Sequence, residues 1–279
     1  MSSPEPALLA LDFDGVLCDG RPEYFATTCL AYRELWPEIG CGAHLDAFRD
    51  AFYAWRPAVA HGWEMPLLLH GLVTGALTDA EPVSTHTWGT HRPTLLAESR
   101  STPAELGGLV DGVRDDWIER DLPDWLGHHN FYPGVVPRLQ TWLAQGSPQL
   151  AILTTKAGRF VQQLFEAADV DFPTTWIWGR EAGRPKVTLL AELVAQGHAP
   201  LWFVEDYRPT LDRVTQTPGL ETVCLFLATW GYNTPAAAAE LGTIQPLTLN
   251  HWHLDLKDWR TPAASPASAP APPSHCRGR

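Results

Sequence analysis

Short, uninterrupted apolar runs recur along this chain, and turn-forming residues or amphipathic segments separate them. Five runs have the length of strands: 7–11, 150–153, 175–178, 201–204 and 222–226. Runs without polar alternation are typical of strands that are covered on both faces. Helical patterns follow three of the later runs, at 158–168, 186–196 and 208–216. This alternation of strand and helix predicts an α/β fold of Rossmann-like type, built on a parallel sheet.

The alternation stops between the first two runs. Residues 12–149 separate them, which is far more than one crossover helix needs. Helical apolar spacing occurs within this segment at 23–36, 43–55, 64–74, 91–99 and 103–121. We therefore predict an α-helical domain at 20–130, inserted into an α/β domain formed by 1–19 and 131–259. Ala, Pro and Ser dominate 260–279, so we expect a disordered tail there.

The acidic composition narrows the classes of partner. The 279 residues include 20 Lys and Arg against 32 Asp and Glu, a net charge of −12. We therefore do not expect the protein to bind nucleic acid or an anionic membrane through its overall charge. A local positively charged pocket is still compatible with this composition. Five cysteines without a CxxC pair predict neither a zinc site nor a disulfide framework. With no signal-like or membrane-spanning apolar run, we expect a cytoplasmic protein. The oligomeric state is left open.

Two acids follow the first apolar run, in Asp12-Phe13-Asp14-Gly15. On a continuing strand, Asp12 and Asp14 would point to the same side. Two carboxylates about 4 Å apart repel by about 4 kcal/mol at an effective dielectric of 20, and a bound cation removes that penalty. Taken alone, the motif is as typical of a simple Asp-Gly turn.

Two further polar features follow later runs. Thr154 comes directly after the second run and precedes a predicted helix, a setting in which a hydroxyl and free backbone N–H groups can bind an anion. Helix capping is the alternative role for Thr154. Lys186 opens the next helical pattern, between the third and fourth runs, where it could reach a phosphate and balance Asp12. Arg184 competes with it for that role.

An acid pair, Glu205-Asp206, closes the fourth apolar run. Buried acids need a cation or a basic partner, and Mg²⁺ prefers oxygen ligands and often bridges to a phosphate. Because open α/β sheets bind ligands at the carboxyl ends of their strands, we expect all these features to meet at one edge.

In this order, the motifs resemble those of the haloacid dehalogenase-like hydrolase superfamily, phosphatase type with a helical cap. The resemblance covers about 7–20 and 130–230. It implies that Asp12 is the nucleophile, Asp14 the acid/base, Thr154 the phosphate-binding hydroxyl and Lys186 the balancing cation. It also implies that the long insertion is the cap.

The resemblance further implies a Mg²⁺ site formed by the Asp12 carboxylate, the Asp14 carbonyl and Asp206, with Glu205 as a second acid. We therefore expect a Mg²⁺-dependent phosphatase of a small phosphorylated metabolite, acting through an aspartyl-phosphate. A phosphomutase would share these residues, and a binding protein on the same fold is the alternative without catalysis. Val16, Thr155, Thr210 and the order Pro185-Lys186 depart from the common family pattern.

Overall fold

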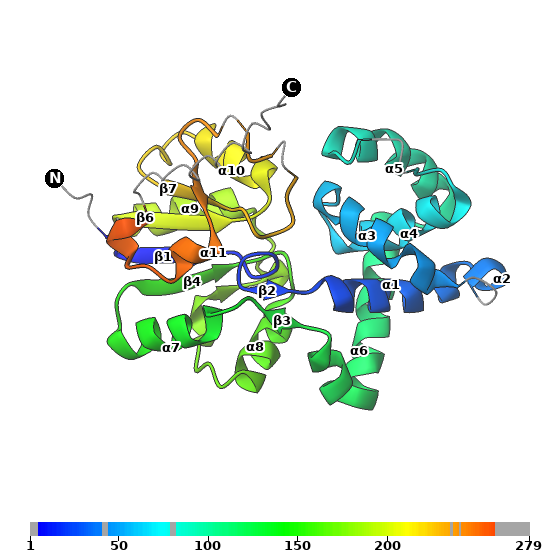
Figure 1. The fold of residues 1–279 in the computed structure, drawn as a ribbon, viewed down its shortest axis with the longest axis horizontal. Helices are drawn as coiled ribbons and strands as arrows, with labels where there is room; N and C mark the ends of the chain where they lie inside the picture. The colour runs from blue at the N-terminus through cyan, green and yellow to red at the C-terminus, as the bar shows by residue number, and fades with distance from the viewer. Residues whose placement is uncertain (1–4, 41–43, 79–81, 235–236, 240, 260–279) are drawn as a thin grey trace, which may run out of the picture.

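A parallel sheet lies at the centre of one half of the molecule (Figure 1). The computed structural model describes residues 5–40, 44–78, 82–234, 237–239 and 241–259, and within them six strands form this sheet. In the order β5-β4-β1-β6-β7-β8, all neighbours are parallel. The strands are β1 Leu8–Leu11, β4 Gln149–Leu153, β5 Ile177–Trp178, β6 Leu201–Glu205, β7 Cys224–Ala228 and β8 Gln245–Leu247. The chain runs outward in opposite directions on the two sides of β1, which makes its carboxyl end a switch point of the kind where ligands bind.

Helices cover both faces of this sheet, which explains the continuous apolar runs. Leu9 and Leu11 of β1 belong to one hydrophobic cluster, whereas Leu8 and Ala10 belong to another on the opposite face. The first face is covered by α7 Val135–Gln145, α8 Gly158–Ala167 and the short α11 Leu249–Trp252. The second is covered by α9 Lys186–Ala195 and α10 Arg208–Thr215.

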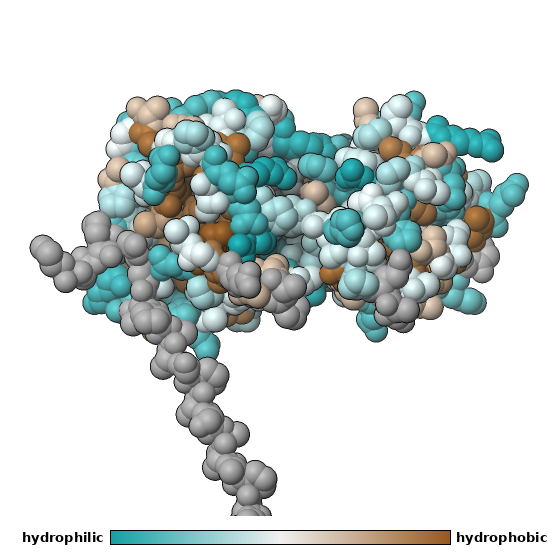
Figure 2. Space-filling view, turned by 90° about the horizontal axis from the view of Figure 1, so that it is seen from above, coloured by the Kyte–Doolittle hydropathy of each residue, from teal (hydrophilic) through white to brown (hydrophobic). Residues whose placement is uncertain are grey.

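The remaining helices form a second body beside the carboxyl edge of the sheet (Figure 1). We call this segment the helical insertion; it comprises α1 Arg21–Leu35, α2 Pro37–Gly40, α3 Arg49–Trp55, α4 Met65–Thr74, α5 Thr85–Ser99 and α6 Pro103–Gly127. It has its own hydrophobic cluster, which includes Phe52, Trp55 and Leu68, and Tyr232 from the α/β core joins it. Hydrophilic residues gather along the junction between the two bodies in Figure 2.

A two-stranded antiparallel ribbon connects the insertion to the sheet. It pairs β2 Cys18–Asp19 with β3 Asn130–Phe131. The chain therefore leaves and re-enters the α/β core at one place. The predicted domain boundaries at 19/20 and 130/131 stay a prediction. The ribbon lies at both of these positions. No described helix is long and apolar enough to span a bilayer.

The predicted α/β class with a parallel sheet is confirmed, and particular elements differ. Half of the third predicted strand is a 3₁₀ turn, in which the Trp176 N–H donates to the Pro173 carbonyl, and Ile177–Trp178 pair with β4. The fifth begins at Cys224 instead of 222. Helix α7 and strand β8 were not predicted. The proposed tail at 260–279 lies outside the described residues.

Candidate active site

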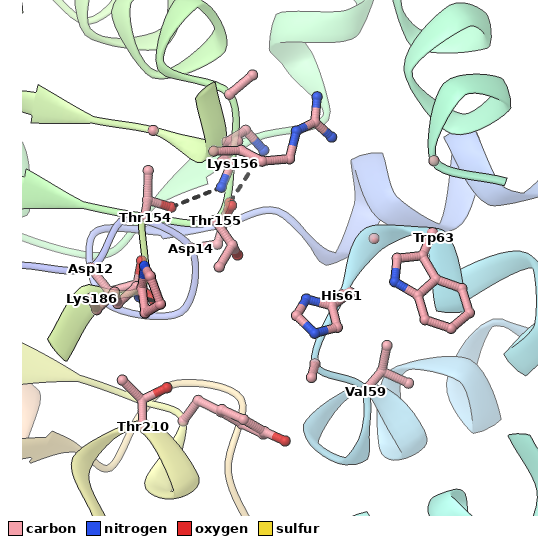
Figure 3. Close-up of a pocket in the computed structure, with 18 of the residues that line it drawn as sticks. Asp12, Asp14, Val59, His61, Trp63, Thr154, Thr155, Lys156, Lys186 and Thr210 are labelled. Atoms are coloured by element: carbon pink, nitrogen blue, oxygen red, sulfur yellow. Dashed lines mark hydrogen bonds and ion pairs between the residues drawn. The ribbon is translucent and has the colours of Figure 1, made fainter. Parts of the chain in front are cut away.

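The carboxyl ends of three neighbouring strands open into one cavity of about 640 Å³. Asp12 follows β1, Thr154 follows β4, and Asp206 follows β6, so these side chains come together although they are far apart in sequence. The helical insertion forms the opposite wall (Figure 3). That wall includes Tyr24, Arg56, His61, Trp63 and Arg114.

Three buried acids and one partly buried lysine form what we call the acid cluster: Asp12, Glu205, Asp206 and Lys186. The Lys186 ammonium bridges two of the acids, since Nζ lies 2.8 Å from Asp12 Oδ2 and 2.7 Å from Glu205 Oε2. Carboxylate oxygens of Asp12, Glu205 and Asp206 lie within 4.8 Å of one another. The Lys186 ammonium therefore pairs with two of the three carboxylates, and the charge of Arg56 compensates Asp206 only in part.

The excess of negative charge affects the pKa values of the residues in the acid cluster. Burial, together with the charge of Glu205, raises the pKa of Asp12 to about 7. Burial and the charge of Asp12 raise the pKa of Asp206 to about 6. Burial would lower the pKa of Lys186, but Asp12 and Glu205 raise it above its ordinary value. The ammonium therefore stays charged, while the carboxylates hold their protons to unusually high pH.

Two glycines leave room for the Asp206 carboxylate. Gly15 has φ +83°, and a Cβ there would lie 1.9 Å from Asp206 Oδ2. A Cβ on Gly231 would lie 2.4 Å from Asp206 Cβ. The Tyr232 N–H donates to Asp206 Oδ2 at 2.6 Å. Any side chain at position 15 would displace the carboxylate and strain the backbone, so the turn after β1 requires glycine.

Asp14 pairs with a different cation from Asp12, and the strand on which the two acids were expected to point to the same side ends before them. The Phe13 carbonyl accepts the N–H groups of Leu17 and Cys18, so the chain turns at this point and does not continue as a strand. The Asp14 Oδ1 atom instead lies 3.3 Å from Lys156 Nζ (Figure 3). Lys156 is buried and its backbone N–H donates to Thr154 Oγ1 at 3.1 Å.

Behind this pair lie two more buried charges, both from the insertion. Glu23 of α1 is fully buried, and its Oε1 accepts a hydrogen bond of 2.6 Å from Arg114 Nε of α6. Burial would raise the pKa of Glu23, but Arg114 and then Lys156 hold it well below its ordinary value. We call Asp14, Lys156, Glu23 and Arg114 the Lys156 cluster.

His129 lies against the Lys156 cluster, where the chain returns from α6 to β3. Burial and then the charge of Lys156 lower the pKa of His129 to about 4, so the ring is neutral at physiological pH. Its Nδ1 lies 3.1 Å from the Trp125 carbonyl oxygen, while Nε2 is buried without a hydrogen-bond partner, 4.0 Å from Glu23 Oε2. The arrangement identifies His129 as a neutral packing residue.

The structure separates the two candidates for the site cation. Arg184 lines the cavity, but its guanidinium pairs with Glu192 of α9. Lys186 contacts Asp12 and Glu205 directly. Lys186 is therefore the cation that sits among the acids.

Thr154 lies where the sequence predicts, buried at the end of β4 and lining the cavity. The nearby N-terminus of α8 is already occupied, because the Gly158 N–H donates to both oxygens of Glu181, at 2.9 and 3.0 Å. An anion beside Thr154 would therefore meet the threonine hydroxyl and the lysine ammonium groups, without the first amide of this helix.

The acid cluster is a suitable donor set for a divalent cation. Its ligand atoms are carboxylate oxygens, which Mg²⁺ prefers, and a cation would offset the burial and mutual repulsion that raise the pKa values of Asp12 and Asp206. Asp12 and Asp206 are best placed to supply it with oxygens. Both Glu205 oxygens already accept hydrogen bonds, from Lys186 and from the Tyr207 N–H.

Sequence reasoning missed three further basic residues that line the cavity. Lys156 follows Thr154 by two positions and is one of three lysines in the chain, a scarcity that could have drawn attention to it. Arg56 and Arg114 come from the insertion, where no motif distinguishes them. Arg56 lies with its guanidinium 5.0 Å from the ring centroids of Tyr24 and Tyr232.

No protein-family model and no curated protein sequence matches this chain. Solved structures do resemble it. A Lactobacillus delbrueckii subsp. bulgaricus protein, provisionally assigned as a phosphoglycolate phosphatase, has a TM-score of 0.56 at 15% identity, over 91% of this chain and 98% of its own. A predicted phosphatase from Clostridium acetobutylicum has a TM-score of 0.55 at 12% identity, over 90% and 97%.

A haloacid dehalogenase-like family hydrolase from Streptococcus pneumoniae has a TM-score of 0.50 at 15% identity, over 89% of this chain and 95% of its own. At such identities the likeness concerns the fold. It extends over nearly the whole of each chain, the helical insertion included. The chain therefore has the fold of the haloacid dehalogenase-like hydrolases.

Proposed function

We propose that this protein is a Mg²⁺-dependent phosphatase that hydrolyses a small phosphorylated metabolite through an aspartyl-phosphate on Asp12. One observation carries the proposal: Asp12, Asp14, Thr154, Lys186 and Asp206 meet in one cavity at the carboxyl edge of the sheet. The fold shared with one provisionally assigned phosphatase and one predicted phosphatase supports it. The cavity, at about 640 Å³, suits a small molecule.

The hydroxyl group and the ammonium group near the strand ends bind the phosphoryl group. Thr154 donates its hydroxyl, and the Lys186 ammonium, held between Asp12 and Glu205, faces the same space. Both act as fixed donors to charge that develops on the transferring phosphoryl oxygens. Asp12 Oδ1 accepts the Phe13 N–H at 2.7 Å, which fixes the orientation of the nucleophile.

In the first step a carboxylate oxygen of Asp12 attacks phosphorus while the bond from phosphorus to the leaving oxygen breaks. Asp14 gives its proton to that leaving oxygen. In the second step Asp14, now a carboxylate, takes a proton from water as the water attacks the phosphoryl group. Asp12 is released and inorganic phosphate leaves.

Mg²⁺, held by Asp12, Asp206 and the Asp14 backbone carbonyl, would supply Lewis-acid stabilisation of the phosphoryl oxygens. Glu205 contributes by holding Lys186, and the Tyr232 N–H orients Asp206. The helical insertion acts as a cap that excludes water and selects the leaving group, since its residues form the far wall of the cavity.

The experiment is a screen of phosphorylated metabolites with the purified full chain, scored by release of inorganic phosphate with Mg²⁺ and with excess chelator. Phosphoglycolate belongs in the panel because of the provisional assignment of the Lactobacillus protein. We expect Mg²⁺-dependent release from at least one member, and none from the Asp12→Asn variant. A flat screen, or release that survives exhaustive chelation, would contradict the proposal.

A further inference from the structure

Lys156 is a buried charged residue that the mechanism above leaves without a task. Its side chain is only 4% exposed, and burying an ammonium is costly unless it is paired. Its Nζ lies 3.3 Å from Asp14 Oδ1 and 5.1 Å from the centroid of the Tyr24 ring, which comes from α1 of the insertion. Both Lys156 and Asp14 line the cavity (Figure 3).

This contact distinguishes the two oxygens of the Asp14 carboxyl. An ammonium can donate hydrogen bonds but cannot accept them. The oxygen that Lys156 contacts, Oδ1, is therefore an acceptor, and because a carbonyl oxygen accepts more strongly than a hydroxyl oxygen, the contact favours a proton of Asp14 on Oδ2. Lys156 thereby fixes which carboxyl oxygen acts as the proton donor and restrains rotation of the carboxyl group.

The insertion supplies the rest of this arrangement. Tyr24 lies on Lys156, and the next residue toward the N-terminus, Glu23, adds a negative charge that Arg114 balances from α6. The backbone of Lys156 is tied to Thr154, the hydroxyl that we assign to the phosphoryl group. Lys156 thus touches the acid, the phosphate-binding strand end and the insertion at once.

We propose that Lys156 is the positioning residue for proton transfer by Asp14, an inference that rests on the proposed phosphatase function. As the bond between phosphorus and the leaving oxygen breaks, its electron pair stays on that oxygen, which takes the proton from Asp14 Oδ2. The carboxylate that results keeps its contact with the Lys156 ammonium. A purely structural lysine would neutralise Asp14 and Glu23 without affecting this step selectively.

The basicity of the leaving group separates the two roles. A phenol that is acidic leaves without a proton, whereas a basic one needs the acid. We would measure kcat/KM for p-nitrophenyl, p-acetylphenyl and phenyl phosphate, whose leaving phenols become more basic in that order. For Lys156→Met we expect a loss of about 10²-fold or more with phenyl phosphate, and less than about tenfold with p-nitrophenyl phosphate.

Three variants frame the result. Asp14→Asn should give the same dependence on the leaving group, and Lys156→Arg, which keeps a charged donor, should restore most of the phenyl phosphate activity. Lys257→Met is the matched control, because Lys257 is exposed and pairs with Asp255 away from the cavity; its kinetics should be those of the wild type. Melting temperatures check folding, and Lys156→Gln replaces the Met variant if the latter does not fold.

An equal loss with all three esters, or no loss, would overturn the role of Lys156 and leave the phosphatase function intact. A wild-type protein that hydrolyses none of the three esters, nor any metabolite in the screen above, would instead overturn the proposed function and this inference with it.

Discussion

The two buried ionic clusters of the cavity differ in how their charges balance. In the acid cluster, three carboxylates face the single ammonium of Lys186, and burial and mutual repulsion raise the pKa values of Asp12 and Asp206. The Lys156 cluster has two carboxylates and two cations, and the pKa of Glu23 is held low. The first cluster therefore lacks a positive charge and suits a metal and a phosphoryl group. The second is complete, and suits a role in holding other groups.

The largest effect that we expect is the loss of the covalent step in Asp12→Asn. The amide keeps the size of the side chain but cannot attack phosphorus, so turnover should vanish. Acid-quenched mass spectrometry with a reactive phosphoryl donor should show no phosphate on the peptide that contains residue 12. An adduct on a different residue would contradict the proposed mechanism, although it would not affect the description of the fold.

Asp14→Asn should fail more mildly, since it removes proton transfer and spares the nucleophile. We expect a loss of about 10²–10⁴ in rate, with the phosphate adduct on Asp12 still forming slowly. The same quenched mass spectra, taken as a time course, measure both steps. If adduct formation is abolished as completely as in Asp12→Asn, the two acids do not have the separate roles assigned here.

Removing a charge from the balanced cluster should destabilise the protein. Glu23→Gln removes the buried counter-ion of Arg114 and leaves it only the partly exposed Asp111, 3.3 Å away, so we expect a loss of up to about 3–5 kcal/mol of unfolding free energy. Urea denaturation measures the change. Glu119→Gln, the same substitution at an exposed position of α6, is the control and should stay within about 0.5 kcal/mol of the wild type. Equal effects of the two would show that the Glu23 pair is dispensable.

Mg²⁺ should stabilise the fold, and more so at alkaline pH. Between about pH 4 and pH 7 the folded metal-free protein binds more protons than the unfolded chain through Asp12 and Asp206, so their contribution to stability falls as pH rises. Protons and Mg²⁺ compete for these oxygens. At a hundred times its dissociation constant the ion adds about 2.7 kcal/mol.

Thermal melts with and without Mg²⁺ at pH 5.5 and pH 8 check this expectation, with Asp12→Asn as the control that should lose much of the shift. A shift that is larger at pH 5.5, or one that Asp12→Asn retains in full, would place the ion elsewhere.

Removing a charge from the acid cluster should increase the free energy of unfolding, whereas removing the charge of Glu23 should decrease it. In the absence of metal, Asp206→Asn should stabilise the protein at pH 8 by about 1–3 kcal/mol, since the ionised carboxylate is disfavoured there by burial and by Asp12. The gain should fade as pH falls toward 4, where the wild-type carboxyl is protonated. Asp171→Asn at an exposed site is the matched control. Denaturation of both variants at the two pH values measures the effect, and a destabilised Asp206→Asn protein would contradict the imbalance.

The strand ends could be predicted from the sequence because the signal there is local. β1, β4 and β6 are covered on both faces, so each reads as an uninterrupted apolar run, and Asp12, Thr154 and Asp206 follow directly. β8 escaped prediction because it is three residues long and contains Pro246, which is typical of an edge strand or a non-strand.

The Lys156 cluster could not be predicted because its contacts join distant parts of the chain. Lys156 meets Asp14 across 142 positions, and Arg114 meets Glu23 across 91. No periodicity or motif links such pairs. The turn after β1 was missed for a related reason: it depends on Gly15 and on the space that Asp206 occupies, which come from different segments.

Tyr232, in the loop between β7 and β8, has a consequence for the order in which the protein is made. Its N–H fixes Asp206, its hydroxyl accepts the Gly20 N–H across 212 positions, and its ring joins the cluster of the insertion. A nascent chain that has not yet emerged past this loop carries Asp12 and Asp14 but lacks the contacts that Tyr232 makes. Because domains fold as their last segments leave the ribosome, the cavity should reach its final geometry among the latest events of synthesis.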